Sequence, residues 1–110
     1  MTEEDFQVCL HAELEQVEDV LGVKAKEYAT DDRLHNFKVA ARVQGSTLRQ
    51  AVGGMMVKHT VSVYDLINSD AEVSLDVWNE KVTDHINYLI LLKACVYEEK
   101  GLLPDANKNN

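Results

Sequence analysis

The sequence predicts an all-α protein, a four-helix bundle-like single domain. Every long segment repeats its apolar residues at intervals of three and four, and none alternates apolar with polar residues as a strand would. Ser, Thr, Asp and Gly residues, which favour helix ends, separate these segments. The 110 residues can bury one modest core. We expect a helical domain over residues 1–104 and a polar, disordered tail over residues 105–110.

The first two helices are predicted over residues 3–28 and from about residue 31 to residue 44. Acidic residues in the first turn suit the positive end of the first helix. Its apolar stripe consists of Phe6, Cys9, Leu10, Leu14, Val17, Val20 and Leu21. An aspartate at either of the first two positions can cap the second helix, and Gly45 can end it.

The third helix is predicted over residues 47–67, and the fourth from Ser74 or Asp76 to about Gly101. Ser46 or Thr47 can cap the third helix. A glycine pair at positions 53 and 54 weakens this helix by about 1 kcal/mol per glycine. Such a pair indicates either a close helix crossing or bend, or close approach of a ligand to the backbone.

The composition restricts the classes of partner and the compartment. A net charge of −8 repels phosphates, so direct binding of nucleic acid is not expected. The acidity either keeps the protein soluble or meets a basic partner. Two cysteines at helical spacing, Cys9 and Cys95, predict buried free thiols in a cytoplasmic protein. No signal peptide and no membrane span is expected.

Two polar stripes interrupt the apolar third and fourth helices. One stripe is Glu80, Asp84 and Asn87, and the other is Lys58, Ser62 and Asp65. Folding the hairpin about residue 71 places Lys58 near Asp84, and Ser62 near Glu80. The stripes are then either an internal salt bridge that fixes the helix register or a polar pocket. In a pocket, Glu80 and Asp84 could hold one magnesium ion, and Lys58 could contact a phosphate.

A second polar cluster covers residues 26–37, at the corner between the first and second helices. It is either a capped turn or the second wall of the pocket. In the second case the substrate-binding residues would be Tyr28, Asp32, Arg33 and Asn36 from this corner, together with Asn87.

The order of these residues resembles a known group of proteins. Lys26-x-Tyr28, Asp32, Asn36-Phe37, Met55-Met56-Val57-Lys58 and Trp78-x-Glu80-x-x-x-Asp84-x-x-Asn87-Tyr88 follow one another over roughly residues 24–96. This order resembles small phage-encoded all-α proteins associated with nucleotide modification. That group is distantly similar to the MazG-like nucleotide pyrophosphohydrolases, which are helical, usually oligomeric, and hydrolyse nucleoside triphosphates with magnesium held by carboxylates of two helices.

The resemblance assigns Glu80 and Asp84 to the second carboxylate motif of those enzymes. The first motif needs several glutamates on the preceding helix, whereas residues 56–62 contain no carboxylate. Either the first helix supplies the missing carboxylates or the hydrolase activity is absent. Its candidates are Glu13, Glu15, Glu18 and Asp19.

Two functions therefore stand at this stage. The first is a phage-type nucleotide-binding or pyrophosphohydrolase-like protein that uses magnesium, with Lys58, Glu80 and Asp84 at its centre. The second is a non-enzymatic acidic phage protein that binds and inhibits a host or defence protein. Either would work in the cytoplasm, that of the host cell if the protein is phage-encoded. Self-association is expected because four apolar helices leave faces that one small core does not cover, and because the resembling enzymes are usually oligomeric.

Overall fold

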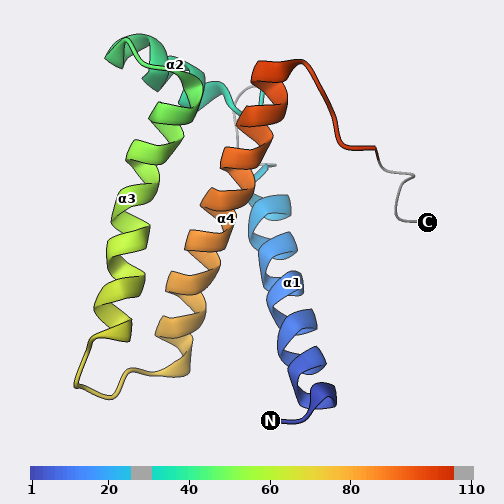
Figure 1. Cartoon of the computed structure of the whole chain (residues 1–110), viewed down its shortest axis with the longest axis vertical. Coiled ribbons are helices and arrows are strands. Elements are labelled where there is room, and N and C mark those ends of the chain that lie inside the picture. Colours follow the sequence, from blue (N-terminus) through green and yellow to red (C-terminus); the bar gives the residue numbers. More distant parts are fainter. Residues whose placement is uncertain (26–30, 106–110) are drawn as a thin grey trace.

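The computed structural model describes residues 1–25 and 31–105, and over these residues the protein is all-α, as predicted. Helices α1 (Glu3–Ala25), α2 (His35–Gln44), α3 (Leu48–Ile67) and α4 (Leu75–Lys100) follow in chain order. Figure 1 shows α3 and α4 as a long antiparallel hairpin, with α2 across one end and α1 beside α4. No helix in the described parts of the chain is long and apolar enough to cross a membrane.

Most helix ends follow the capping residues of the sequence. The start of α2 does not: its N-cap is Leu34 and not an aspartate, because the Asp32 oxygens bond the Leu34 N–H and Lys38. The Thr47 side chain accepts a hydrogen bond from the Gln50 backbone N–H, and the Gln50 side chain accepts one from the Thr47 N–H, which is a complete capping box. Ser74 caps α4 in the same way, through the Val77 N–H. Gly45 and Gly101 end α2 and α4, both with a φ of 64°, which favours glycine. These ends lie within one residue of the predicted ones.

The core lies where α2 crosses the α3–α4 hairpin. Its buried residues are Leu34, Phe37, Val52 and Cys95, and the partly buried residues packed against them include Leu48, Met55, Tyr88 and Leu92. The Phe37 and Tyr88 rings meet edge to face, with centroids 6.3 Å apart. This cluster fixes one end of the hairpin and the corner that leads into α2.

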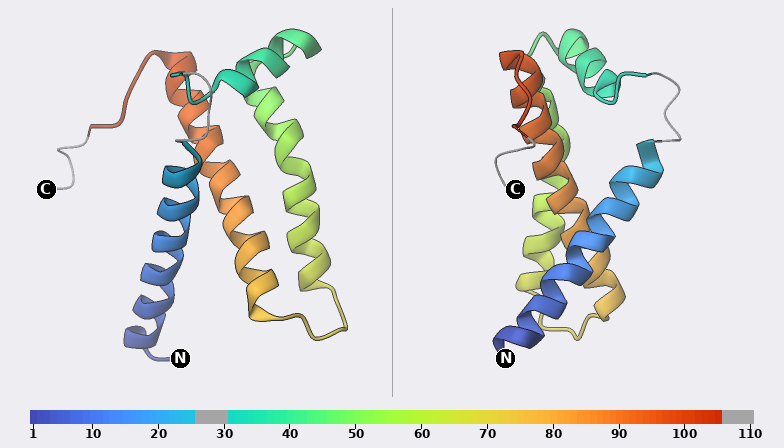
Figure 2. Two further views of the ribbon diagram at one scale, coloured as in Figure 1. Left: turned by 180° about the vertical axis from the view of Figure 1, so that it is seen from behind. Right: turned by 90° about the vertical axis from the view of Figure 1, so that its right-hand side faces the viewer.

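Helix α1 is only partly packed. It crosses α4 obliquely, and Figure 2 shows its N-terminal half leaving the hairpin. Val17 is buried at the crossing, whereas residues 1–12 are all exposed. The two cysteines differ accordingly: Cys95 is buried as predicted, but the prediction of a buried Cys9 was wrong, because no helix of the described residues packs on that part of α1.

The register of the hairpin differs from the symmetric one. Folding about residue 71 would place Thr60 opposite Val82, but Thr60 Oγ1 lies 3.0 Å from His85 Nε2. Ser62, expected near Glu80, instead donates a hydrogen bond to the Lys58 carbonyl of its own helix. The register differs because the connection over residues 68–74 allows α3 and α4 to shift along each other. Its midpoint therefore does not determine which residues of α3 lie opposite which residues of α4.

A close helix crossing, one of the roles suggested for the glycine pair of α3, does not occur among the described residues. A Cβ placed on Gly53 or Gly54 would have no heavy atom within 4 Å beyond its own helix turn. No close helix crossing therefore requires these glycines. Because alanine restricts the unfolded chain and suits a helix, Gly53→Ala and Gly54→Ala should each stabilise the protein by about 1 kcal/mol. Urea unfolding measures this, and a loss of stability for both variants would contradict the open space seen at these positions.

Candidate functional site

A mixed-charge pocket of about 260 Å³ lies where α1, α3 and α4 meet the corner before α2. Three of its polar residues were predicted on α3 and α4, namely Lys58, Asp84 and Asn87, and a fourth, Arg33, comes from the corner. Its other lining residues are Val20, Leu21, Phe37, His59, Tyr88 and Leu91. The fold thus brings together cations, a carboxylate and an amide from distant parts of the chain.

Asn87 is the most unusual residue of this pocket. Its side chain is 5% exposed, and its Oδ1 has no hydrogen-bond partner among the described residues. A buried acceptor that loses its water without gaining a donor costs about 1–3 kcal/mol. Among the described residues, Asn87 thus holds an unmet acceptor in a residue that lines this pocket, and an N–H or O–H group brought to that atom would satisfy it.

His59 and Tyr88 form a stacked ring pair at the same pocket, with centroids 4.5 Å apart and an interplanar angle of 28°. Burial lowers the pKa of His59 below its ordinary value of 6.5, and nearby Asp84 opposes this effect. The imidazole is thus favoured in its neutral form, which can both donate and accept a hydrogen bond. The sequence-based prediction passed over His59, because a single helical histidine shows no spacing pattern.

The lowered pKa of His59 predicts how stability depends on pH. The folded protein binds this proton less tightly than the unfolded chain, so stability is complete above pH 6.5 and falls as the pH drops below it. Asp84, Lys58, Lys81 and His85 surround the ring and stay in place in a His59→Gln variant. Thermal unfolding from pH 8 to pH 5 should show a shallower decline for this variant than for the wild type, and identical declines would rule out His59 as the cause.

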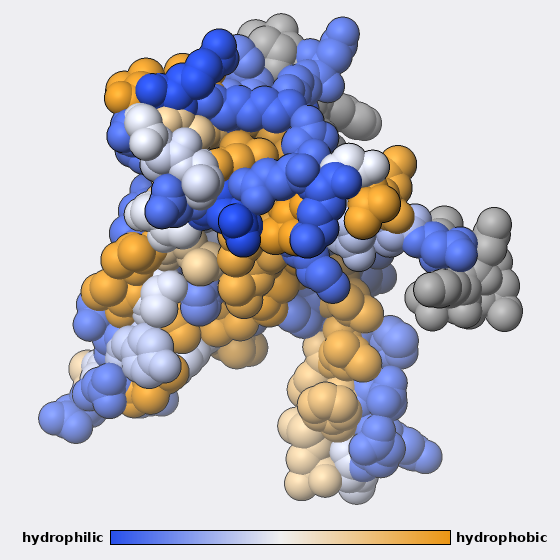
Figure 3. Space-filling view, turned by 45° about the horizontal axis from the view of Figure 1, so that its top comes forward, coloured by the Kyte–Doolittle hydropathy of each residue, from blue (hydrophilic) through white to orange (hydrophobic). Residues whose placement is uncertain are grey.

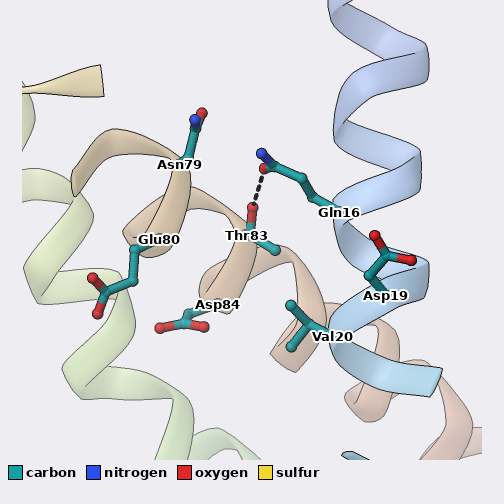
Figure 4. A pocket seen from close by; sticks show the side chains of 7 residues that line it. All are labelled: Gln16, Asp19, Val20, Asn79, Glu80, Thr83 and Asp84. Atoms are coloured by element: carbon teal, nitrogen blue, oxygen red, sulfur yellow. Dashed lines mark hydrogen bonds between the residues drawn. The ribbon is translucent and has the colours of Figure 1, made fainter. Parts of the chain in front are cut away.

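An acidic cleft of about 330 Å³ adjoins the pocket and shares Val20 and Asp84 with it. Its remaining lining residues are Gln16 and Asp19 of α1 and Asn79, Glu80 and Thr83 of α4. Figure 4 shows Glu80 and Asp84 pointing to the same side of α4, whereas Thr83 points toward Gln16. The buried Thr83 hydroxyl donates to Glu13 Oε1 at 2.9 Å and lies 3.1 Å from Gln16 Oε1. This contact anchors α1 on α4.

The carboxylates offer a pair rather than a complete metal cage. No group of three or more His, Cys, Asp or Glu residues in the described part of the chain could hold a metal ion. Of the α1 candidates, Glu13 is bonded to Thr83, Glu15 and Glu18 are exposed, and only Asp19 lines the cleft. Glu80 and Asp84 can therefore supply two ligands to magnesium, which commonly takes one or two carboxylates and completes its shell with water and substrate phosphates.

The expected salt bridge between Lys58 and a carboxylate of α4 does not form. Lys58 is exposed, and none of the ion pairs between described residues joins it to Asp84 or Glu80. The nearest cation to Glu80 is Lys81, at 3.7 Å. The shifted hairpin register is the cause, because it moves Lys58 along α4 while leaving it at the rim of the pocket that Asp84 lines.

Asp32 has a structural contact where substrate binding was predicted. Its Oδ1 accepts a hydrogen bond from the Leu34 N–H, and its Oδ2 lies 2.6 Å from Lys38 Nζ. Lys38 also reaches Glu98 of α4, at 2.5 Å. The hydrogen bond from Lys38 lowers the pKa of Asp32. Asp32 thus closes a turn before α2 and does not cap this helix, whose N-cap is Leu34, and this small ionic network ties the corner to α4.

The other residues predicted at this corner differ in whether they line the pocket. Arg33 lines the mixed-charge pocket, whereas Asn36 lies exposed on α2 and lines none of the pockets described here. Asn36 directly precedes Phe37 on α2, and neighbouring helix positions point about 100° apart, so Asn36 faces outward when Phe37 faces the core. Tyr28 lies outside the described residues.

Comparison with protein-family models, with curated proteins and with solved structures gave no match for this chain. The candidate site therefore depends on its geometry alone.

Proposed function

We propose that this protein binds a nucleotide in the mixed-charge pocket and the adjoining acidic cleft, as a phage-type protein of the MazG-like kind. The observation that supports this most is the buried side-chain oxygen of Asn87, which has no partner among the described residues and belongs to a pocket that Lys58 and Arg33 also line. A nucleotide offers both complementary groups, because its base carries N–H donors and its phosphates are anionic.

The pocket suggests how such a ligand would lie. Asn87 Oδ1 would accept a hydrogen bond from the base, next to the stacked His59 and Tyr88 rings. Lys58 and Arg33 would face the phosphates. Because Asp84 is common to the pocket and the cleft, the phosphate chain would extend toward Glu80. Each contact would use a residue that lines the pocket or the cleft.

Magnesium fits this proposal as an ion that arrives with the nucleotide. Glu80 and Asp84 would hold it, and it would polarise a phosphate oxygen as a Lewis acid. With two carboxylates, the protein alone should bind the free ion weakly. We place the protein in the cytoplasm, that of the host cell if it is phage-encoded, where nucleotides and magnesium are plentiful.

A second candidate function is inhibition of a host or defence protein through an acidic surface. It is favoured by the exposed acidic side chains of α1, which include Glu3, Glu4, Glu15 and Glu18. Under this function a nucleotide screen would give neither binding nor turnover. Neutralising these side chains would instead slow association with a basic partner, most strongly at low salt.

Calorimetric titration with nucleoside mono-, di- and triphosphates, with and without magnesium, tests the first proposal. Lys58→Ala should weaken triphosphate binding about tenfold, as expected for one lost charge-assisted contact. Because Lys58 is exposed and unpaired among the described residues, its removal should change the unfolding free energy by less than about 1 kcal/mol. Lys100→Ala removes an exposed lysine at the far end of α4 and serves as the matched control. Equal binding by both variants would count against the pocket.

A further inference from the structure

The isolated chain exposes more surface than a compact protein of its size. A 12.4 kDa monomer is expected to expose about 6,100 Å², whereas this chain exposes 8347 Å². Its radius of gyration is 16.3 Å, against about 13 Å for a compact domain of this length. Residues 101–105 are all exposed, and two surfaces on the helices also expose large apolar side chains.

The first surface is the α1 ridge, formed by Phe6, Leu10 and Leu14. These side chains are 50%, 39% and 49% exposed. In Figure 3 the α1 leg, at lower right, is hydrophobic on the side toward the rest of the molecule and hydrophilic on the other. The wholly exposed part of α1, residues 3–12, is short enough to be only marginally helical in water unless it packs on something. The ridge therefore has the pattern of a packed helix without the partner that would cover it.

The second surface is the α4 groove, an apolar hollow of about 840 Å³ on the outer side of α4. It is lined mainly by Ile86, Leu89, Ile90, Tyr97, Leu102 and Leu103. Leu89 and Ile90 are 47% and 43% exposed. Since α3 and α1 pack on other sides of α4, this groove is a further side of α4 that no helix in the described part of the chain covers.

We propose that these surfaces bind each other between two copies of the chain, the α1 ridge of each copy lying in the α4 groove of the other. Phe6 to Leu14 spans about 12 Å along a helix and Ile86 to Tyr97 about 16 Å, so the groove is long enough for the ridge. The arrangement is reciprocal and closes with two-fold symmetry. A stable dimer buries about 600–1,000 Å² per partner, which the excess surface of this chain can supply.

Sedimentation velocity on the full chain tests the dimer. The wild type should be a dimer at micromolar concentrations, and Leu10→Asp and Ile90→Asp should each raise the dissociation constant at least tenfold. Val43→Asp changes an equally apolar residue that is 82% exposed on α2 and belongs to neither surface, so it should leave the constant unchanged. A monomeric wild type, or a dimer that neither ridge nor groove substitution weakens, would overturn the proposal.

Mixing the two charged variants tests the reciprocal arrangement. A heterodimer of Leu10→Asp and Ile90→Asp chains retains one intact ridge and one intact groove that face each other. It should therefore associate more tightly than either variant alone. If the mixture associates no better than the separate variants, the ridge does not lie in the groove.

Cys9 provides a readout that needs no substitution. It is exposed in the single chain and flanks the ridge, one residue before Leu10. Its alkylation by a maleimide should slow as the protein concentration rises through the dimer range. Cys95 is buried, and burial raises its pKa to about 11, so it should stay unreactive throughout. A Cys9 rate independent of concentration would overturn the proposal.

Discussion

Replacing Glu80 and Asp84 together with their amides should reduce magnesium-dependent nucleotide binding, and any turnover, by roughly two orders of magnitude or more. Both carboxylates lie on one side of α4, and the described residues provide no larger group of metal ligands to take over their role. The Glu80→Gln and Asp84→Asn changes keep side-chain volume and remove charge. Calorimetry and a phosphate-release assay with magnesium or manganese measure the loss.

The fold should survive this double substitution. Glu80 is 63% exposed and Asp84 has no ion pair within the described residues, so stability should change by less than about 1 kcal/mol. Asp65→Asn with Glu72→Gln is a matched control, since it changes the net charge equally at exposed positions outside the cleft. Undiminished magnesium-dependent binding in the Glu80/Asp84 variant would refute the metal assignment.

Asn87→Leu should make the ligand-free protein more stable and the binding site inactive. Leucine has nearly the shape of asparagine and removes an acceptor that is buried without a partner, so stability should rise by about 1–2 kcal/mol. The same change removes the group that we propose accepts a hydrogen bond from the nucleotide base, so affinity should fall about tenfold or more. Chemical unfolding and calorimetry on one preparation measure both effects.

Asn36→Leu is the control for this prediction, because Asn36 is exposed on α2 and lies outside the pocket. It should change stability by no more than about 0.5 kcal/mol and leave binding intact. A structural asparagine at position 87 would give the opposite stability result, a clear loss on substitution. That outcome would show that Asn87 contributes to the packing of the folded protein and not to a ligand.

The helices of this protein could be predicted from local chemistry. Thr47 and Ser74 begin α3 and α4, and Gly45 ends α2, where the sequence indicated, because caps depend on residues only a few positions apart. The apolar spacing of α1 was also correct as a helical pattern. It could not reveal that Phe6 and Leu10 would remain exposed in the single chain, because periodicity reports which face is apolar and not what covers it.

Part of the site could also be predicted from helical spacing. Lys58, Asp84 and Asn87 do line one pocket, since a helical hairpin must bring stripes on facing helices together. The exact pairs were not predictable, because two helices can slide along each other with little change in buried area. The ion pair of Asp32 was not predicted because its partner, Lys38, is six residues away and their contact depends on how the corner folds. His59 drew no notice because stacking on Tyr88 leaves no spacing signal.

A nucleotide titration followed by NMR tests the central claim most directly. Spectra that resolve the Asn87 side-chain amide and the His59 ring would be recorded while a magnesium–nucleoside triphosphate is added. We expect both groups to shift together and saturably, while the exposed Asn36 amide and the His35 ring on α2 stay unchanged. Saturable binding that leaves Asn87 and His59 unmoved, or no binding by any nucleotide, would contradict the account.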